Sequence, residues 1–199
     1  MRQETGSNPI STNKKVSIQV KLGGRSFSAD NFAAAEEATS VEFVIDTPRV
    51  TLAPRGEVSL DNAAELLRIV GKGCLDNEQS VCSELQANIV AVMAIDSKAL
   101  NAIVKKWGSR ATFSSPLLDM RHSDDYALTI DCSDNVCYMR LFDEGLRHAE
   151  AYATTAPEDV LYHVTEWLDN EEWETPIYIK GSKATAKLLR KYFKQVICE

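Results

Sequence analysis

The chain has 199 residues, of which 44% are hydrophobic and 26% are charged, so it can bury the core of one globular domain or of two small ones. Its 29 acidic and 22 basic side chains leave a net charge of −7, which repels phosphate backbones and anionic lipid and so disfavours nucleic-acid binding. No run is apolar enough to span a membrane or to act as a signal peptide, and the five cysteines lack metal-ligand spacing, so we expect a cytoplasmic protein with reduced thiols.

The first predicted element is a hairpin that follows a polar tail. Residues 1–13 hold almost nothing to bury and are predicted to be disordered. Over residues 14–29, apolar and polar side chains alternate on both sides of Gly23 and Gly24, and a two-residue turn there places every apolar side chain on one face. A third strand, interrupted by a proline, is predicted over residues 41–52.

Two helices and a buried strand are predicted next. Ser59 can cap a helix whose apolar residues recur at helical spacing as far as Val70. The apolar run 88–95 is typical of a buried strand. Asp96 can then begin a second helix, which Gly108 ends.

The second half of the sequence begins with another hairpin. Residues 128–132 and 137–141 alternate in the same way around an Asp-Asn turn. A two-residue turn pairs Cys132 with Cys137 and again places the apolar side chains on one face. Such a pair is close enough for a cross-strand disulfide, but in a reducing compartment we expect two small buried thiols.

Four further elements complete this half. A strand is predicted over residues 146–152, and a helix follows that begins with a capping box formed by Thr155 and Glu158. A buried strand over residues 176–180 then leads into a helix over residues 182–196.

The order β-β-β-α-β-α therefore occurs twice along the chain. Three antiparallel strands, followed by a strand reached through a helix, predict a mixed sheet with helices on its faces, which is an α/β unit. We predict a first half over residues 14–108, a connection over 109–125 and a second half over 126–199.

Two such units in tandem resemble the actin-like ATPase fold of sugar kinases, heat-shock 70 chaperones, actin and the pilus-assembly protein PilM, in which each half is ribonuclease-H-like. The resemblance covers residues 14–196 and is closest to an uncharacterised bacterial family assigned that fold. The segments that carry this resemblance are Val16-Ser-Ile-Gln-Val20 with Phe27, Thr51-Leu-Ala-Pro54, Ser115-Pro-Leu-Leu118 and Ile177-Tyr-Ile-Lys-Gly-Ser182.

The resemblance implies a nucleotide site with an aspartate and glycines on the hairpins, where backbone amides approach the phosphates and carboxylates hold magnesium through water. In this chain Gln19 and Lys21 stand at the first aspartate and glycine positions. Only part of the second set is present, so we expect degenerate phosphate loops and no bound cofactor. If ATP and magnesium do bind, the candidate residues are Asp131, Asp134, Gly181 and Ser182.

These observations predict a non-catalytic scaffold that works by contact with an unknown protein partner. One alternative is a divergent magnesium-dependent ATPase. A metal-dependent nuclease using Asp131 and Asp134 ranks last, because Asp131 points away from the apolar face and the net charge is unsuited to nucleic acid. We assign no catalytic residue and no metal ligand, since the histidines share no spacing and the cysteines form no CxxC motif.

The C-terminal region holds the candidate contact residues for a protein partner. An acidic loop carries a tryptophan, and an exposed tryptophan can anchor a partner. The last helix carries lysines that would suit an acidic partner. The candidate contact residues are Trp173, Lys183, Lys187 and Lys194.

Overall fold

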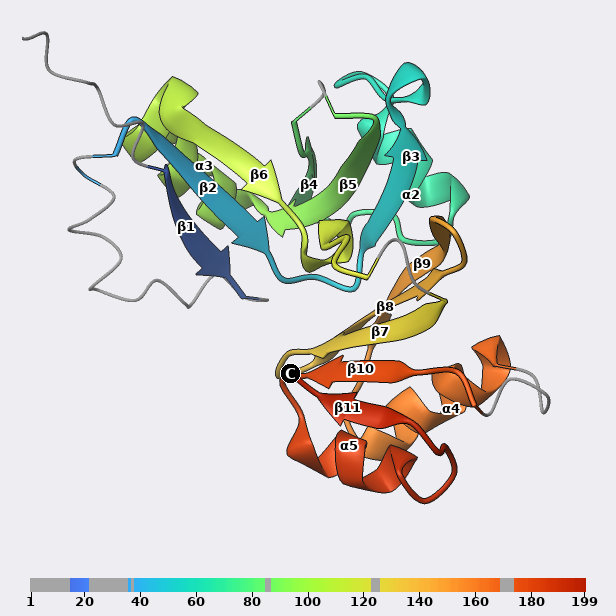
Figure 1. Ribbon diagram of the computed structural model, residues 1–199. Coiled ribbons are helices and arrows are strands. Elements are labelled where there is room, and N and C mark those ends of the chain that lie inside the picture. Colours follow the sequence, from blue (N-terminus) through green and yellow to red (C-terminus); the bar gives the residue numbers. More distant parts are fainter. Residues whose placement is uncertain (1–14, 22–35, 37, 85–86, 123–125, 169–173) are drawn as a thin grey trace, which may run out of the picture.

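Figure 1 shows a computed structural model of the protein. The structure describes residues 15–21, 36, 38–84, 87–122, 126–168 and 174–199. The predicted tail, both turn glycines of the first hairpin and its second strand lie outside these residues. The described strands form one five-stranded and two three-stranded sheets.

The five-stranded sheet forms the C-terminal half and has the order β11-β10-β7-β8-β9. Its strands are β7 (Ala127–Cys132), β8 (Val136–Phe142), β9 (Leu146–Ala153), β10 (Ile177–Lys180) and β11 (Val196–Cys198). The first three are antiparallel neighbours, whereas β10 is parallel to β7 and β11 is parallel to β10. The predicted hairpin register is confirmed, since Cys132 lies opposite Cys137 and the apolar pairs follow from it.

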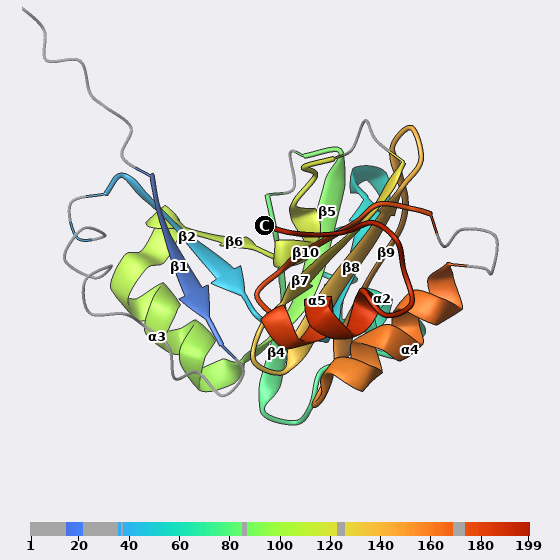
Figure 2. The same ribbon diagram turned by 60° about the horizontal axis from the view of Figure 1, so that its bottom comes forward.

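Two helices, α4 (Pro157–Trp167) and α5 (Lys183–Leu189), cover one face of this sheet (Figure 2). At the start of α4 the capping carboxylate belongs to Asp159 rather than to Glu158, because Asp159 accepts hydrogen bonds from the backbone N–H of Thr155 and Ala156. The helix predicted over residues 182–196 is too long. The chain leaves α5 after Leu189, and its last residues pair with the free edge of β10 as β11.

The N-terminal half contains two smaller sheets. A parallel sheet has the order β1-β2-β6, and an antiparallel sheet has the order β3-β5-β4. The strands are β1 (Lys15–Val20), β2 (Ser40–Ile45), β3 (Val50–Pro54), β4 (Glu78–Cys82), β5 (Ile89–Asp96) and β6 (Ala111–Ser114). The helices are α2 (Ala63–Ile69) and α3 (Ser97–Trp107), with short 3-10 turns at η1 (Arg55–Glu57), η2 (Gly108–Arg110) and η3 (Pro116–Leu118).

This half differs from its predicted order in several respects. The prediction of three antiparallel strands is wrong for β1 and β2, which are parallel neighbours, because parallel pairing is set by contacts between distant segments and not by a local turn. Strand β4 has no counterpart in the predicted order. The segment 41–52, predicted as one interrupted strand, supplies β2 to the parallel sheet and β3 to the antiparallel sheet. Pro48 lies in the bend between them, where its missing N–H costs no ladder hydrogen bond. The region 109–125, predicted as a connection, contains β6, which pairs with β2 and so belongs to the first sheet.

Other N-terminal elements agree with the sequence pattern. Strand β5 occupies the apolar run, and α3 begins at Asp96, whose carboxylate accepts from the N–H of Lys98 at 2.9 Å and of Ala99 at 3.0 Å. The helix predicted from Ser59 begins later, because Ser59 and Asn62 instead exchange hydrogen bonds in a turn that precedes α2.

The two halves share one arrangement of parallel strands. The order β1-β2-β6 in the first half matches β7-β10-β11 in the second, and in each case a helix, α3 or α5, precedes the last strand. Among the described residues, no helix is long and apolar enough to cross a membrane.

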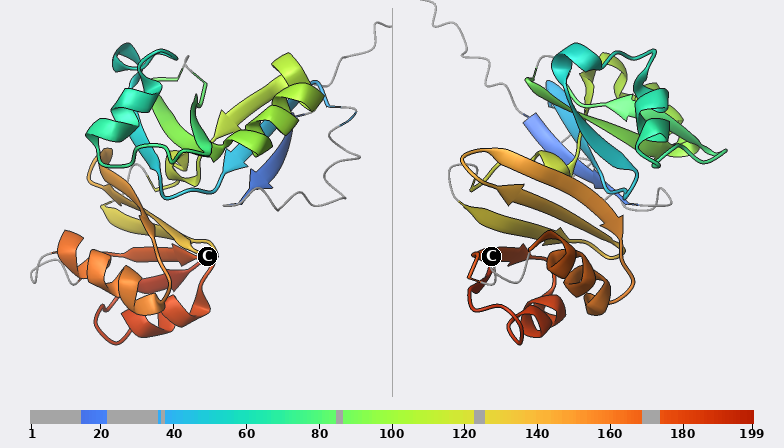
Figure 3. Two further views of the ribbon diagram at one scale, coloured as in Figure 1. Left: turned by 180° about the vertical axis from the view of Figure 1, so that it is seen from behind. Right: turned by 90° about the vertical axis from the view of Figure 1, so that its right-hand side faces the viewer.

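The second face of the five-stranded sheet packs against the N-terminal half (Figure 3). Val136 and Tyr138 of β8 share a core with Phe43 of β2 and Trp107 of α3. Strand β8 is buried along its whole length, because it has helices on one side and the other half on the other. The ends of β1 and β7 therefore meet at the junction of the two halves.

Candidate functional site

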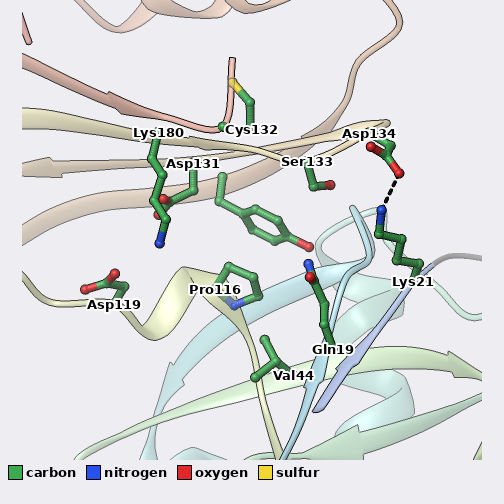
Figure 4. A pocket seen from close by; sticks show the side chains of 12 residues that line it. Gln19, Lys21, Val44, Pro116, Asp119, Asp131, Cys132, Ser133, Asp134 and Lys180 are labelled. Atoms are coloured by element: carbon green, nitrogen blue, oxygen red, sulfur yellow. Dashed lines mark hydrogen bonds and ion pairs between the residues drawn. The ribbon is translucent and has the colours of Figure 1, made fainter. Parts of the chain in front are cut away.

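A cleft of about 440 Å³ opens at this junction (Figure 4). The C-terminal ends of β1, β2, β7 and β10 lie at this cleft, and residues at these ends form much of its walls. From the N-terminal side and the segment after β6 it is lined by Gln19, Lys21, Val44, Pro116 and Asp119. From the C-terminal half it is lined by Asp131, Cys132, Ser133, Asp134, Tyr138, Lys180 and Gly181.

The carboxylate of Asp131 is held by a buried arginine. Arg140 of β8 is 2% exposed, and its Nη2 donates to Asp131 Oδ2. Its Nε donates to Thr129 Oγ1 at 2.9 Å, and its Nη1 donates to the carbonyl of Pro116. The Asp131 side chain is itself only 16% exposed. This carboxylate is therefore neutralised from within the protein before any ligand enters.

A second ion pair joins the two halves across the cleft. Lys21, just after β1, donates to Asp134 in the β7–β8 turn, as the dashed line in Figure 4 shows. The hydrogen bond that Lys21 donates to Asp134, followed by the negative charge of Asp134, raises the pKa of Lys21, so the amine stays a cation. Both side chains are solvent-exposed, so the pair itself adds little to stability.

The third aspartate in the cleft is held in the same way. Burial opposes the ionisation of Asp119, but hydrogen bonds from the backbone N–H of Arg121 at 3.1 Å and from its guanidinium prevail and lower the pKa of Asp119. The amine of Lys180 extends into the cleft alongside Asp131 (Figure 4). Among the described residues Lys180 has no ion-pair partner.

A buried network lies beneath the cleft and links the halves. The Tyr138 hydroxyl donates to Asp46 Oδ1 at 2.8 Å and accepts from the N–H of Thr47 at 2.8 Å. The Ser133 hydroxyl donates to the same Asp46 oxygen at 2.9 Å. Burial, followed by the charge of Asp46, raises the pKa of Tyr138 far above its usual range, so the residue stays a neutral phenol.

Gly181 is required by a close backbone contact. Its φ is +89°, and a Cβ at this position would lie 1.9 Å from the carbonyl oxygen of Cys132. The turn between β10 and α5 therefore packs directly against the end of β7. Ser182 is not part of the cleft wall, because its hydroxyl caps α5 by accepting from the N–H of Thr185 at 3.2 Å.

Comparison with known proteins identifies the fold. No protein-family model matches the chain, and no curated protein is significantly similar to it. A crystal structure of a Bacteroides thetaiotaomicron protein with actin-like ATPase fold and unknown function matches with a TM-score of 0.70 at 15% identity, covering 98% of this chain and 94% of that one. This chain has the actin-like ATPase fold.

Two solved structures show weaker likenesses. The cytoplasmic domain of EpsL, an inner membrane component of the type II secretion system of Vibrio cholerae, matches with a TM-score of 0.45 at 11% identity, over 83% of this chain and 81% of that one. The AlfA filament bound to AMPPNP matches with a TM-score of 0.38 at 11% identity, over 88% of this chain and 62% of that one. The fold assignment rests on the Bacteroides protein alone.

The cleft gathers most of the residues that the resemblance to actin-like ATPases singled out. Three of the four candidate cofactor residues, Asp131, Asp134 and Gly181, line it together with Gln19 and Lys21. The side chains of Gln19 and Lys21 occupy the wall where the resemblance implies an aspartate and a glycine. Within the described part of the chain, no group of three or more His, Cys, Asp or Glu side chains could hold a metal ion.

The sequence analysis missed the residues beneath this cleft of the actin-like fold. Arg140 and Asp46 are both buried and charged, yet neither belongs to a motif. The register offered one signal, because Arg140 lies opposite Thr129 and two residues away from the partner of Asp131. A charged residue on the second face of an otherwise apolar strand indicates that this face meets a polar partner.

The four predicted contact residues differ in their surroundings. Trp173 lies outside the described residues. Lys183 and Lys187 are exposed on α5, and neither forms an ion pair with another described residue. Lys194 pairs with Glu174 at 2.7 Å.

Proposed function

We propose that this chain is a non-catalytic scaffold of the actin-like ATPase fold, which works by protein contact and without nucleotide. The observation that carries the proposal is that each of the three aspartates lining the cleft is bound to a cation of the chain itself. These pairs are Asp131 with Arg140, Asp134 with Lys21 and Asp119 with Arg121.

Magnesium chemistry needs carboxylates that are free to orient the water shell of the ion. Releasing Asp131 for this role would leave Arg140 buried without its counter-ion, which costs about 3–5 kcal/mol in proteins. Close approach of phosphates to backbone amides also needs positions without a Cβ. Among the cleft residues at positions that the resemblance singles out, only Gly181 lacks a Cβ, and the backbone carbonyl of Cys132 already occupies the space beside it.

The proposal includes two ribonuclease-H-like halves. The C-terminal sheet supports this, because three antiparallel strands are followed by two parallel ones that are each reached through a helix. The matching parallel strands of the N-terminal half support it as well. We place the first half at residues 14–108 together with β6, and the second at 126–199.

A thermal-shift titration with ATP and magnesium tests whether nucleotide binds. A ligand at about 100 times its dissociation constant adds roughly 2.7 kcal/mol, which would raise the Tm of a chain of this length by about 5–11 °C. We expect no shift, either with ATP and magnesium or with ATP in EDTA.

One observation favours a divergent magnesium-dependent ATPase as the second candidate. At the junction of the halves the cleft collects Asp131, Gly181 and Lys180, the last a cation without an ion-pair partner in the described part of the chain. A magnesium-dependent rise in Tm that Asp131→Asn removes would establish this candidate and overturn the scaffold proposal. A rise that persists in EDTA would indicate an anion that binds to Lys180 without metal.

Exposed lysines on α5 give the proposed contact surface for an acidic partner. We expect the double variant Lys183→Glu and Lys187→Glu to lower capture of that partner about tenfold or more, because like charges across an interface cost at least about 1.4 kcal/mol. The measurement is quantitative mass spectrometry of proteins captured from a lysate of the source cells. The matched control, Lys98→Glu with Lys105→Glu, makes the same charge change on exposed positions of α3. Equal loss in both variants would contradict a contact on α5.

A further inference from the structure

Two cysteines face each other at the tip of the β7–β8 hairpin. Cys132 and Cys137 are direct partners in the register, and both are free thiols. The N–H of Ser133 donates to the carbonyl of Val136 at 2.8 Å, which closes the two-residue turn and makes the cysteines the adjoining non-hydrogen-bonded pair. The Cα atoms of such a pair lie about 4.5 Å apart, within the range of about 4.4–6.8 Å that a disulfide bridges.

The environments of the two thiols differ. Cys137 is completely buried in the core beneath α4 and α5, whereas Cys132 lies at the border of that core. Figure 4 shows the Cys132 sulfur pointing away from the cleft. Cys132 is therefore the less buried thiol of the pair, and Cys137 lies directly opposite it on β8.

Two hydrogen bonds are directed at the Cys132 sulfur. They come from the Cys137 thiol and from the hydroxyl of Thr185, a residue that is 3% exposed. The hydroxyl of Ser182 lies 2.8 Å from that of Thr185 and can donate to it, which leaves the Thr185 proton for the sulfur. The hydrogen bond from Cys137 lowers the pKa of Cys132, while the same bond and burial raise the pKa of Cys137. Ionisation of the Cys132 thiol is thus favoured, and ionisation of the Cys137 thiol is opposed.

We propose that Cys132 and Cys137 form a redox-active dithiol that a hydroperoxide oxidises to a disulfide. The Cys132 thiolate attacks one peroxide oxygen, the O–O bond breaks, and the second oxygen leaves as hydroxide and takes up a proton to become water. The sulfenic acid on Cys132 is then attacked by the sulfur of Cys137. The S–S bond forms as the S–O bond breaks, and the released hydroxide takes the Cys137 proton. The two thiols lose two electrons and two protons, and hydrogen peroxide becomes two waters.

The test uses a background in which Cys74, Cys82 and Cys198 are changed to serine, so that only the pair remains. After exposure to hydrogen peroxide, intact mass spectrometry should show a protein lighter by two hydrogen atoms, and dithiothreitol should reverse the change. With Cys137→Ser, a dimedone adduct should form on residue 132. With Cys132→Ser, residue 137 should stay a thiol.

Thr185→Val tests the hydrogen bond to the sulfur. We expect disulfide formation to slow roughly tenfold or more, because a hydrogen bond to a charged group contributes at least that factor. Thr165→Val, at an exposed position of α4, is the control and should leave the rate unchanged.

Three outcomes overturn the proposal: no mass change, oxygen added to Cys132 while Cys137 stays reduced, or equal reactivity of the two single-cysteine variants. If the triple serine background fails to fold, the natural chain is treated with hydrogen peroxide and analysed by peptide mapping. A peptide pair linked by a disulfide between residues 132 and 137 would support the proposal, and its absence would overturn it.

Discussion

Replacing Arg140 with methionine should lower the free energy of unfolding by about 3–5 kcal/mol, because it leaves the carboxylate of Asp131 and the hydroxyl of Thr129 without their buried partner. For a chain of this length the Tm should fall by about 6–20 °C. Urea denaturation followed by circular dichroism measures the change. Arg147→Met is the control, because Arg147 is exposed and its distance to Asp143 is 3.9 Å, so its loss should stay within about 0.5 kcal/mol.

A second variant separates the ion pair from simple packing. Asp131→Leu combined with Arg140→Met removes both charges, and replacing a whole buried pair by apolar side chains is often neutral or stabilising. We therefore expect the double variant to regain most of the stability that the single variant loses. If Arg140→Met costs less than about 1 kcal/mol, then Asp131 is hydrated in the folded state and remains available to a metal ion. That result would favour the ATPase candidate.

The C-terminal half was predictable because its signals are local. Strict alternation on both sides of the Asp134 turn sets the β7–β8 register, and a one-residue slip would have turned every apolar side chain outward. The apolar stripe of α4 is equally clear, since Val160, Val164 and Leu168 are all buried. The prediction failed at the capping residue of α4 and at the C-terminal end, where β11 is three residues long and lies at the sheet edge.

The N-terminal half was less predictable because its pairing is not local. Strand β1 lies next to β2, which starts twenty residues after β1 ends, and β2 in turn lies next to β6. Parallel pairing of this kind leaves no turn signal in the sequence. Strands β4 and β6 are short and mostly half-buried, so neither has a continuous apolar run.

The candidate site shows the same division. Asp131, Asp134 and Gly181 could be named in advance, because they lie at strand ends and turns that the pattern defines. The residues that bind or support them could not be predicted, because they come from distant parts of the sequence. Lys21 pairs with Asp134 from the other half, and the hydrogen bond between Tyr138 and Asp46 joins residues 92 positions apart. The pairing of these charges depends on how the two halves pack against each other. The hydrophobic period of a segment does not predict which distant segment it packs against.

Gly181→Ala should be the most disruptive single change at the rim of the cleft, with an expected loss of about 2–5 kcal/mol from a strained φ and a collision with the backbone of Cys132. Gly71→Ala measures the cost of the strained φ alone, because Gly71 has a φ of +74° but nothing lies within 4 Å of the added carbon. We expect this variant to lower the free energy of unfolding by about 1–2 kcal/mol. At Gly56 φ is not positive and nothing lies within 4 Å of an added carbon, so Gly56→Ala should leave the stability nearly unchanged. Equal losses at positions 181 and 71 would show that Cys132 moves aside at little cost. In that case the space beside Gly181 would be open to a ligand, whereas a larger loss at 181 confirms that the fold itself requires this glycine.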